Sequence, residues 1–341
     1  MTLLAIETSC DETGAAVVRD GSVPANIVSS QMKLHEEYGG VVPELAAREH
    51  LKNLMPVVNA ALSAANVGVA QLDAVAATQG PGLPGALMIG FKAAQAMAFA
   101  LRKPFLGVHH HEAHLYSPWI TGDPPRADFA DFQPNVSLIV SGGHTLLVHV
   151  AGEFQHRVLG GTIDDAAGEC FDKTGKLLGL PYPAGPVIDR LAEHGNPQAY
   201  DFPRPLLHDA SDDFSFSGLK TSVRYFLRDH PEIAADEHAV RDLCASVQAA
   251  IVEVLVAKTV RAAKRLGVKC VTASGGVVCN RALRGGLAAK CARAGLALRL
   301  AEAKFSTDNA AMIGILAERK LMRQPQGTSF EAEIAPNWAL A

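Results

Sequence analysis

Features typical of secreted, disulfide-bonded and membrane-spanning proteins are missing from this sequence. The six cysteines are scattered and form no Cys-x-x-Cys pair, so we expect reduced thiols rather than a disulfide framework. No apolar run approaches the ~20 residues that a membrane helix needs. The first residues, MTLLAIETSCDET, contain no basic segment and turn acidic at once, which argues against a signal peptide. These absences predict a soluble, cytoplasmic protein that does not contact a membrane.

An overall excess of positive charge is also missing. The 341 residues include 31 Lys and Arg against 35 Asp and Glu, a formal net charge of −4, so no global attraction to nucleic acid is expected. The distribution is uneven, because residues 254–300 contain ten Lys or Arg and no Asp or Glu. This stretch predicts either a basic face for a polyanion or an ordinary pair of solvated helices.

The length of the chain and its hairpin patterns predict two lobes. Short apolar runs at 2–8 and 15–19 flank a polar turn, and the run at 135–150 repeats this strand-turn-strand pattern. Residues 121–134, rich in Pro and Asp, look like the connection between the halves. We therefore predict an α/β protein whose two lobes are related by an internal repeat. The expected parts are a first lobe over 1–133, a second lobe over 134–323 and a tail over 324–341.

Hydrophobic periodicity predicts the other elements. In the first half, helices are expected over 42–65 and from the turn at 80–85 to about residue 101. In the second half, helices are expected over 164–179, 185–194, 216–229, 236–266 and 307–321, and another begins at residue 280. Further strands are expected at 72–79, 104–108, 154–160, 268–276 and 296–300.

Three turns rich in small residues follow predicted strands. Two lie in the hairpins (SCDETG and SGGH), and the third, ASGGVVCN over 273–280, joins a strand to a helix. Small residues let the backbone approach a ligand closely, and their N–H groups can form a concavity that binds anions. The turns predict either a nucleotide cleft between the lobes or simple reversals of the chain.

The segment GVHHHEAHLYSP, residues 107–118, holds four histidines in six positions. On a helix, residues three or four apart share a face, so His110 and His114 could bind one metal ion, and His111 and His114 form a second candidate pair. Two imidazoles need a further ligand, and Asp308 is the best candidate, unless it only caps the following helix.

A zinc protease is the first activity that such a cluster suggests. That chemistry needs a glutamate directly after the first histidine ligand, as general base. Here Glu112 lies two residues after His110, which turns it about 200° away on a helix with ~100° per residue. The protease hypothesis therefore fails on geometry.

Eight longer motifs follow one another from about residue 3 to residue 318. They are IETSCDETG, HHHEAH, VSGGHT, DDAAGECFDKTGKLLG, YPAGP, SFSGLKT, GGVVCNRALR and STDNAAMI. Together they resemble the universal tRNA N6-adenosine threonylcarbamoyltransferase family, once misnamed O-sialoglycoprotein endopeptidases. The resemblance implies the actin-like ATPase fold. It also implies transfer of a threonylcarbamoyl group from threonylcarbamoyl-AMP to N6 of adenosine 37, the nucleotide 3′ to the anticodon, in tRNAs reading codons that begin with A.

The resemblance also assigns roles to residues. His110, His114 and Asp308 would bind one divalent ion, iron in preference to zinc. Asp11 and Glu12 would lie near the reacting carbonyl and phosphate. From the chemistry of the transfer, we expect Asp11 to accept the N6 proton. Substrate contacts would come from Val140, Ser141, Gly142, Gly143, His144, Asp172, Gly185, Asp189 and Asn280. The implied partners are tRNA, an inactive paralogue and a small ATPase.

Three positions and two other functions stay open. His111 stands where the family often has an apolar residue, so it is either an extra ligand or a surface histidine. Ala184 replaces a common glycine, and Lys220 has no firm role beyond a tRNA-facing one. An actin-like small-molecule kinase or a nucleotide-binding scaffold would use the same cleft, without needing a metal on paired histidines.

Overall fold

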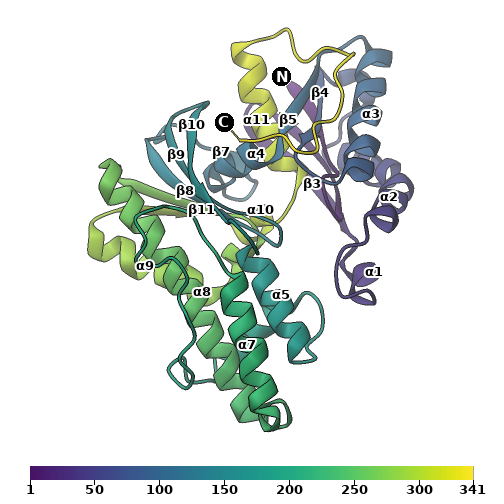
Figure 1. Cartoon of the computed structure of the whole chain (residues 1–341). Helices are drawn as coiled ribbons and strands as arrows, with labels where there is room; N and C mark the ends of the chain where they lie inside the picture. The colour runs from purple at the N-terminus through teal and green to yellow at the C-terminus, as the bar shows by residue number, and fades with distance from the viewer. Residues whose placement is uncertain (341) are drawn as a thin grey trace. The chain divides into compact units, whose positions relative to one another are not determined.

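The computed structural model describes residues 1–340, which divide into two compact units (Figure 1). The first unit comprises Met1–Asp131 together with Thr307–Leu340, and the second comprises Phe132–Ser306.

A seven-stranded sheet forms the centre of the first unit. Its strands are β1 (Thr2–Glu7), β2 (Glu12–Arg19), β3 (Ser22–Ser30), β4 (Ala74–Gly80), β5 (Phe105–His109), β6 (Ile120–Thr121) and β7 (Arg126–Ala127). The strand order is β5-β4-β1-β2-β3-β7-β6, with β1 antiparallel to β2 and parallel to β4. β4 and β5 are also parallel, so the carboxyl ends of β1, β4 and β5 meet at one edge of the sheet.

Helices cover both faces of this sheet. They are α1 (Met32–Glu36), α2 (Pro43–Ala64), α3 (Pro84–Leu101), α4 (His110–Tyr116) and α11 (Ala310–Arg323), with 3-10 turns η1 (Val69–Gln71) and η2 (Ser117–Trp119). Leu4 and Ile6 of β1 pack into one apolar cluster with residues of α2 and α3. On the other face, Gly314 of α11 lies so close that an added Cβ would stand 2.6 Å from Val18. The alternation along β1 and β2 therefore explains the two helical layers.

The second unit contains a five-stranded sheet of order β10-β9-β8-β11-β12. Its strands are β8 (Asn135–Val140), β9 (Thr145–Gly152), β10 (Gln155–Gly161), β11 (Cys270–Ser274) and β12 (Ala297–Leu300). Its helices are α5 (Ala167–Leu177), α6 (Ala184–Ala192), α7 (Ser217–Asp229), α8 (Glu237–Leu266), α9 (Arg281–Ala294) and α10 (Ala303–Ser306), with 3-10 turns η3 (Pro231–Ala235) and η4 (Gly276–Cys279).

The two sheets share a pairing pattern. β8 is antiparallel to β9 and parallel to β11, as β1 is antiparallel to β2 and parallel to β4. The expected internal repeat is thereby confirmed. The main strand that the sequence did not predict is β3, whose residues SVPANIVSS alternate only partly between buried and exposed positions.

Helix ends follow local capping chemistry. The carboxylate of Asp236 accepts a hydrogen bond from the N–H of His238 at the start of α8, at 2.8 Å, and Gly267 ends that helix with φ 68°. The expected helix over 236–266 is therefore confirmed with nearly the same bounds.

The last helix belongs to the first unit. The sequence-based division placed residues up to 323 in the second lobe, but α11 packs against β1 and β2 and contacts α4. The physical reason is its apolar face, which fills the side of the first sheet opposite α2 and α3. The tail after α11 also lies on the first unit.

Two helices, α3 and α8, are long and apolar enough to cross a membrane by length and composition alone. The apolar window of α8 is 78% buried inside the protein, where it forms the central helix of the second unit's core. α3 packs on β4 and α2. The apolar window of α3 is 39% buried, so packing within the unit covers this helix only in part.

Candidate metal centre and glycine loops

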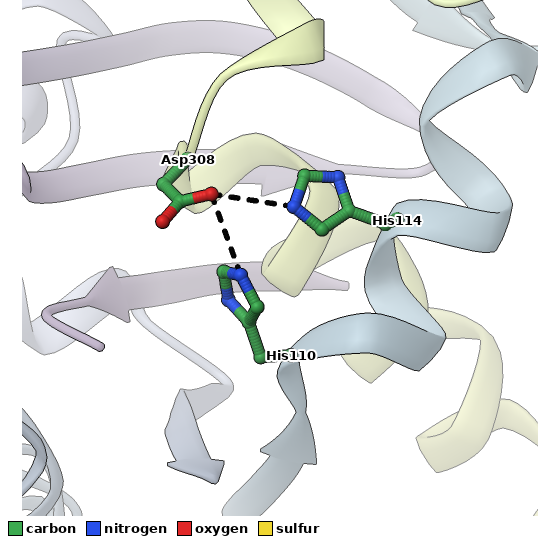
Figure 2. A group of neighbouring side chains, drawn as sticks. All are labelled: His110, His114 and Asp308. Atoms are coloured by element: carbon green, nitrogen blue, oxygen red, sulfur yellow. Dashed lines mark hydrogen bonds and ion pairs between the residues drawn. The ribbon is translucent and has the colours of Figure 1, made fainter. Parts of the chain in front are cut away.

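Two histidines of α4 and one aspartate before α11 face one another (Figure 2). Asp308 Oδ1 lies 3.3 Å from His110 Nε2 and 3.3 Å from His114 Nε2. The three potential ligand atoms all lie within 4.8 Å of one another, and both histidines are buried. The four-residue spacing predicted from the sequence therefore places both imidazoles on one face of a helix, as expected.

Asp308 is not the cap of α11. The side chain of the next residue, Asn309, accepts a hydrogen bond from the N–H of Met312 at 3.1 Å, and its amide donates to the carbonyl of Thr307 at 2.8 Å. Asn309 therefore satisfies the helix start and leaves the Asp308 carboxylate directed at the histidines. This resolves the alternative that the sequence left open.

The buried carboxylate of Glu7 contacts the Nδ1 side of the His110 imidazole, opposite the side that faces Asp308. The Nδ1 of His110 lies 3.1 Å from Glu7 Oε2 and 3.2 Å from Ser9 Oγ. Glu7 is fully buried and also accepts hydrogen bonds from the N–H of Ser9 and the hydroxyl of Thr78, both at 2.5 Å. A proton held on Nδ1 by Glu7 leaves Nε2 as the ligating atom, which is the usual support for a metal-bound histidine.

Two carboxylates, those of Glu7 and Asp308, lie beside the imidazole of His110. Burial alone would lower the pKa of His110, but Asp308 and Glu7 raise it well above its usual range. Burial would raise the pKa of Asp308, whereas His110 and His114 hold it well below its usual range. A divalent ion can replace the proton between these groups, since metal binding releases protons from its ligands.

The donor set fits a divalent transition metal. Two imidazole nitrogens and one carboxylate oxygen on a buried face are the ligands of metal sites that keep open positions. Ser9, Thr78 and Glu7 supply the outer support that such sites require. Glu7 was not among the predicted site residues, although it ends β1 and belongs to the motif IETSCDETG.

Glu112 and His111, which also lie in α4, contact residues other than Asp308. Glu112 turns to α11, where its Oε2 lies 2.5 Å from Lys320 Nζ, so it does not serve the histidines as a base. His111 is 6% exposed, and its ring lies 5.6 Å from that of His110. The expectation of a surface histidine is therefore wrong, and His111 is also outside the three-residue ligand group. The cause is that every residue of α4 is buried.

The turn between β1 and β2 carries Cys10 and Asp11, and Glu12 is the first residue of β2. Burial and the nearby carboxylates of Asp11 and Asp308 raise the pKa of Glu12 well above its usual range. The backbone carbonyl of Asp11 accepts a hydrogen bond from the N–H of Gln31 at 2.9 Å. This turn therefore belongs to the same electrostatic cluster as the metal ligands.

In the second unit, Val140 ends β8 and residues 141–144 form the hairpin turn to β9. The N–H of Ser141 donates to the carbonyl of His144 at 2.8 Å, and the N–H of His144 donates to Ser141 Oγ at 3.2 Å. Gly142 and Gly143 are exposed, and a Cβ added at either would meet no atom within 4 Å. The tip therefore leaves room for a ligand close to the backbone.

The glycine turn after β11, which contains Gly275, contacts the end of β8 at Val140. Gly275 has φ 98°, and an added Cβ would stand 2.2 Å from the carbonyl oxygen of Val140. Only glycine permits this approach. The turns after β8 and β11 are thereby held together at one edge of the sheet.

The other expected substrate residues form two pairs. Asp172 Oδ1 accepts a hydrogen bond from the N–H of Ala184 at 2.7 Å, which fixes the loop before Gly185. Asp189 accepts from the N–H and the side chain of Arg281, the residue after Asn280. Asn280 itself caps α9 and donates to Gln248 Oε1 at 2.6 Å. A cavity of about 940 Å³ adjoins this second pair, lined in part by Asp189, Gln248 and Arg281.

Lys220 pairs with a carboxylate of its own unit. Its Nζ lies 2.9 Å from Asp165 Oδ2, and Lys173 Nζ lies 2.9 Å from Asp165 Oδ1. These contacts join α7 to α5.

Most of the basic stretch over 254–300 is engaged within the second unit. Arg281 pairs with Asp189 and Glu193, and Arg284 donates to the carbonyls of Val278 and Ala301. Lys258, Arg261 and Arg265 also bind acceptors of this unit. Within residues 1–340, four exposed cations of the stretch have no ion-pair partner: Lys264, Lys269, Lys290 and Arg293.

Comparison with known proteins identifies the family. The profile of TsaD, tRNA N6-adenosine threonylcarbamoyltransferase, matches residues 22–315. The chain belongs to this family. Proteins named tRNA N6-adenosine threonylcarbamoyltransferase include one from Prosthecochloris aestuarii that is 50% identical, with 95% of both chains covered. Another, from Geotalea uraniireducens, is 49% identical and covers 100% of this chain and 97% of its own. Such threonylcarbamoyltransferases are transferases that modify tRNA.

Solved structures of the actin-like ATPase fold resemble this member of the threonylcarbamoyltransferase family. Full-length HypF in a phosphate- and nucleotide-bound form aligns with TM-score 0.60 and 13% identity, over 96% of this chain and 47% of that one. Component A of (R)-2-hydroxyglutaryl-CoA dehydratase from Acidaminococcus fermentans aligns with TM-score 0.55 and 14% identity, over 94% and 99%. At these identities the likeness concerns the fold alone, and it confirms the expected fold class.

Proposed function

We propose that this chain transfers the threonylcarbamoyl group from threonylcarbamoyl-AMP to N6 of adenosine 37 in tRNAs reading codons that begin with A. Family membership over residues 22–315 supports the reaction class. The group of His110, His114 and Asp308, in which both histidines are buried, is the single structural observation that carries the proposal. We place the reaction in the cytoplasm, where tRNA is available.

We propose Fe²⁺ as the bound ion, with Zn²⁺ as the alternative, held by His110, His114 and Asp308. A divalent ion bound there supplies Lewis acidity toward the threonylcarbamoyl or phosphate oxygens, with no redox step. Glu7 and Ser9 orient the imidazole of His110 through its Nδ1. The two-histidine, one-carboxylate set leaves coordination positions for substrate oxygens.

The glycine loops of the second unit are proposed to bind the donor. The exposed backbone at Gly142 and Gly143, between Ser141 and His144, offers N–H groups to a carboxylate or phosphate. Val140 anchors this turn. Asp172, Gly185, Asp189 and Asn280 are proposed to contact the nucleotide part of the donor.

The transfer step needs a proton acceptor. The N6 amine of adenosine attacks the carbonyl carbon of the mixed anhydride, the bond from that carbon to the phosphate oxygen breaks, and AMP leaves with the bonding electrons. We assign the N6 proton to Asp11, with Glu12 beside it. Burial and the neighbouring carboxylates raise the pKa of Glu12 well above its usual range, which favours the protonated form of Glu12. Positioning of the two substrates can contribute ~7–11 kcal/mol of barrier lowering.

Partners are proposed for the first unit. Leu51 and Met55 are four residues apart on α2 and are 69% and 50% exposed. Exposed apolar side chains on one helical face are typical of protein contacts. We propose that this face binds the inactive paralogue and that a small ATPase completes the complex. We also propose that the two units correspond to the two lobes of the fold.

Mass spectrometry of tRNA nucleosides tests the function. Unmodified tRNA is incubated with synthetic threonylcarbamoyl-AMP, the metal-loaded chain and its partners, and the digested nucleosides are analysed. The expected product is threonylcarbamoyladenosine at position 37. A kinase or a scaffold would form none, and a tRNA with a G at position 37 is the matched control.

A further inference from the structure

The segment that follows α11 docks along the first unit rather than trailing away from it (Figure 1). The N–H of Thr328 donates to the carbonyl of Phe105 at 2.6 Å, and its hydroxyl accepts from the N–H of Gly107 at 2.9 Å. Further along, the N–H of Ala335 donates to the carbonyl of Gln79 at 2.8 Å. These bonds follow β5 and then the end of β4, so the segment leads toward the edge of the sheet that carries the metal centre.

The approach of this segment leaves no spare room. A Cβ added at Gly80 would stand 1.9 Å from the carbonyl oxygen of Ala335, and one added at Gly327 would stand 2.5 Å from that of Phe105. Gln95 Nε2 donates to the carbonyl of Ala332 at 2.9 Å. The sheet and α3 are thus shaped to receive residues 328–338.

One route from the docked segment to the metal ligands passes through the loop before α3. The N–H of Gly82 donates to the carbonyl of Pro336 at 3.1 Å, and the N–H of Leu83 donates to the carbonyl of Ser9 at 2.8 Å. The hydroxyl of Ser9 lies 3.2 Å from His110 Nδ1. The segment therefore supports the residue that orients His110.

A second route passes through His109, which precedes His110. The Nε2–H of His109 donates to the carbonyl of Trp338 at 3.2 Å, and its Nδ1 accepts from the N–H of Glu112 at 3.3 Å, which caps α4. The indole of Trp338 lies against the His109 ring, with 4.8 Å between ring centroids. Trp338 thereby fixes the side chain that starts the helix bearing both histidine ligands.

We propose that residues 328–338 are a positioning element of the metal centre, so that docking of this segment and binding of the metal strengthen each other. The inference rests on the metal centre proposed above and not on the transfer reaction. Coupling between two binding equilibria is reciprocal, so it is measurable from both sides.

Hydrogen exchange measures one side of the coupling. The full-length chain is stripped of metal and then compared with and without Zn²⁺, and again with Fe²⁺ in the absence of oxygen. Metal is expected to slow amide exchange in the peptide that covers residues 324–340 by at least fivefold. The same ion is expected to leave the peptide of α7 unchanged and to have no effect on the tail in His110→Ala.

Metal affinity measures the other side. Trp338→Ala removes an indole that is 38% exposed, so the variant is expected to fold and to bind Zn²⁺ about tenfold more weakly in competition with a chelator. Loss of outer support around a metal site commonly costs 10–100-fold in affinity. Tyr225→Ala, at an aromatic residue of α7 that is 53% exposed, is the matched control and is expected to bind like the parent chain.

Two results would overturn the inference. If metal leaves exchange over 324–340 unchanged, or if Trp338→Ala binds Zn²⁺ as the parent does, the segment is docked but not coupled. If the parent chain binds neither Zn²⁺ nor Fe²⁺, the metal centre itself is refuted. Neither readout involves tRNA, so a failure of the proposed transfer reaction remains distinguishable from a failure of this coupling.

Discussion

Glu112 of α4 and Lys320 of α11 form an ion pair between the helix of His110 and His114 and the helix that follows Asp308, with 2.5 Å between Oε2 and Nζ. The Glu112 side chain is 8% exposed and that of Lys320 is 28% exposed. The pair joins the helix of His110 and His114 to the helix that follows Asp308. It therefore helps to hold the carboxylate ligand beside the imidazoles.

Lys320→Met should destabilise the protein by about 2 kcal/mol, because it leaves the carboxylate of Glu112 buried without its partner. Urea unfolding measures the change in free energy. The double variant Glu112→Gln with Lys320→Met removes both charges and should regain part of the loss. An unchanged urea midpoint in Lys320→Met would contradict the assignment.

His110→Ala should remove most bound iron or zinc while leaving the secondary structure intact, because one of three ligands is lost. Metal content is measured by elemental analysis after purification without a histidine tag. His194→Ala, at an exposed histidine of the second unit, is the control and should keep its metal. One equivalent of metal retained by His110→Ala would refute the ligand assignment.

The free cations of α9 test whether the basic stretch binds tRNA. Replacing Lys290 and Arg293 by Ala should weaken tRNA binding and reduce the slope of log K against log salt by about 1.4–1.8, since each phosphate contact contributes ~0.7–0.9. Binding is measured at several salt concentrations. Arg284→Ala is the control, because its guanidinium donates to carbonyls of its own unit. An unchanged slope in the double variant would place the tRNA elsewhere.

Asp164 gives a prediction for acid stability. Burial would raise its pKa, but hydrogen bonds from Ser215, Ser217 and the N–H of Phe216 lower it below the usual value. Because the folded pKa is the lower one, the stabilisation is present above pH ~4 and is lost as the pH falls through the folded pKa.

Asp164→Ala should therefore cost about 1 kcal/mol at pH 7, as for loss of a helix cap, and progressively less below pH 4. Urea unfolding at pH 7 and at pH 3 measures both values. Asp201→Ala, at a fully exposed side chain, should show little loss at either pH. A loss in Asp164→Ala that is equal at both pH values would contradict the assignment.

The isolated chain should bind tRNA weakly and turn over slowly. Outside residues 254–300 it carries 21 basic against 35 acidic residues, and screening over ~8 Å reduces repulsion without creating attraction. The purified partners should restore multiple turnover, and Leu51→Asp on α2 should abolish that restoration. Full turnover by the chain alone, given tRNA and threonylcarbamoyl-AMP, would show the prediction to be wrong.

The grouping of the three candidate metal ligands was predictable, because the spacing of the two histidines is local and the motif around Asp308 is specific. A spacing of four residues fixes His110 and His114 on one helical face, whatever surrounds the helix. Glu7 was not predictable, because it lies about a hundred residues from His110 and meets it only through the order β5-β4-β1 of the sheet. The burial of His111 was missed for the same reason, since α4 is enclosed by elements distant in sequence.

The repeat of hairpin and parallel strand was also readable from the sequence, because period and turn composition are local properties. The unit to which α11 belongs was not. The apolar face of α11 does not specify which of the two sheets it packs on, and neither does the short connection from β12 to α11. Which basic side chains form ion pairs was also not predictable. Arg265 and Arg281 pair with Asp212 and Asp189, and these carboxylates come close to them only when the second unit is folded.

The return of Thr307–Leu340 to the first unit sets an order of events during synthesis. When the ribosome has made the first 131 residues, both histidines exist but α11 and Asp308 do not. While the whole second unit is translated, the face of the first sheet that α11 later covers has no helix packed on it. A nascent chain therefore gains the third residue of the candidate metal group only after the whole second unit has been translated, and chains released before that point lack the full group.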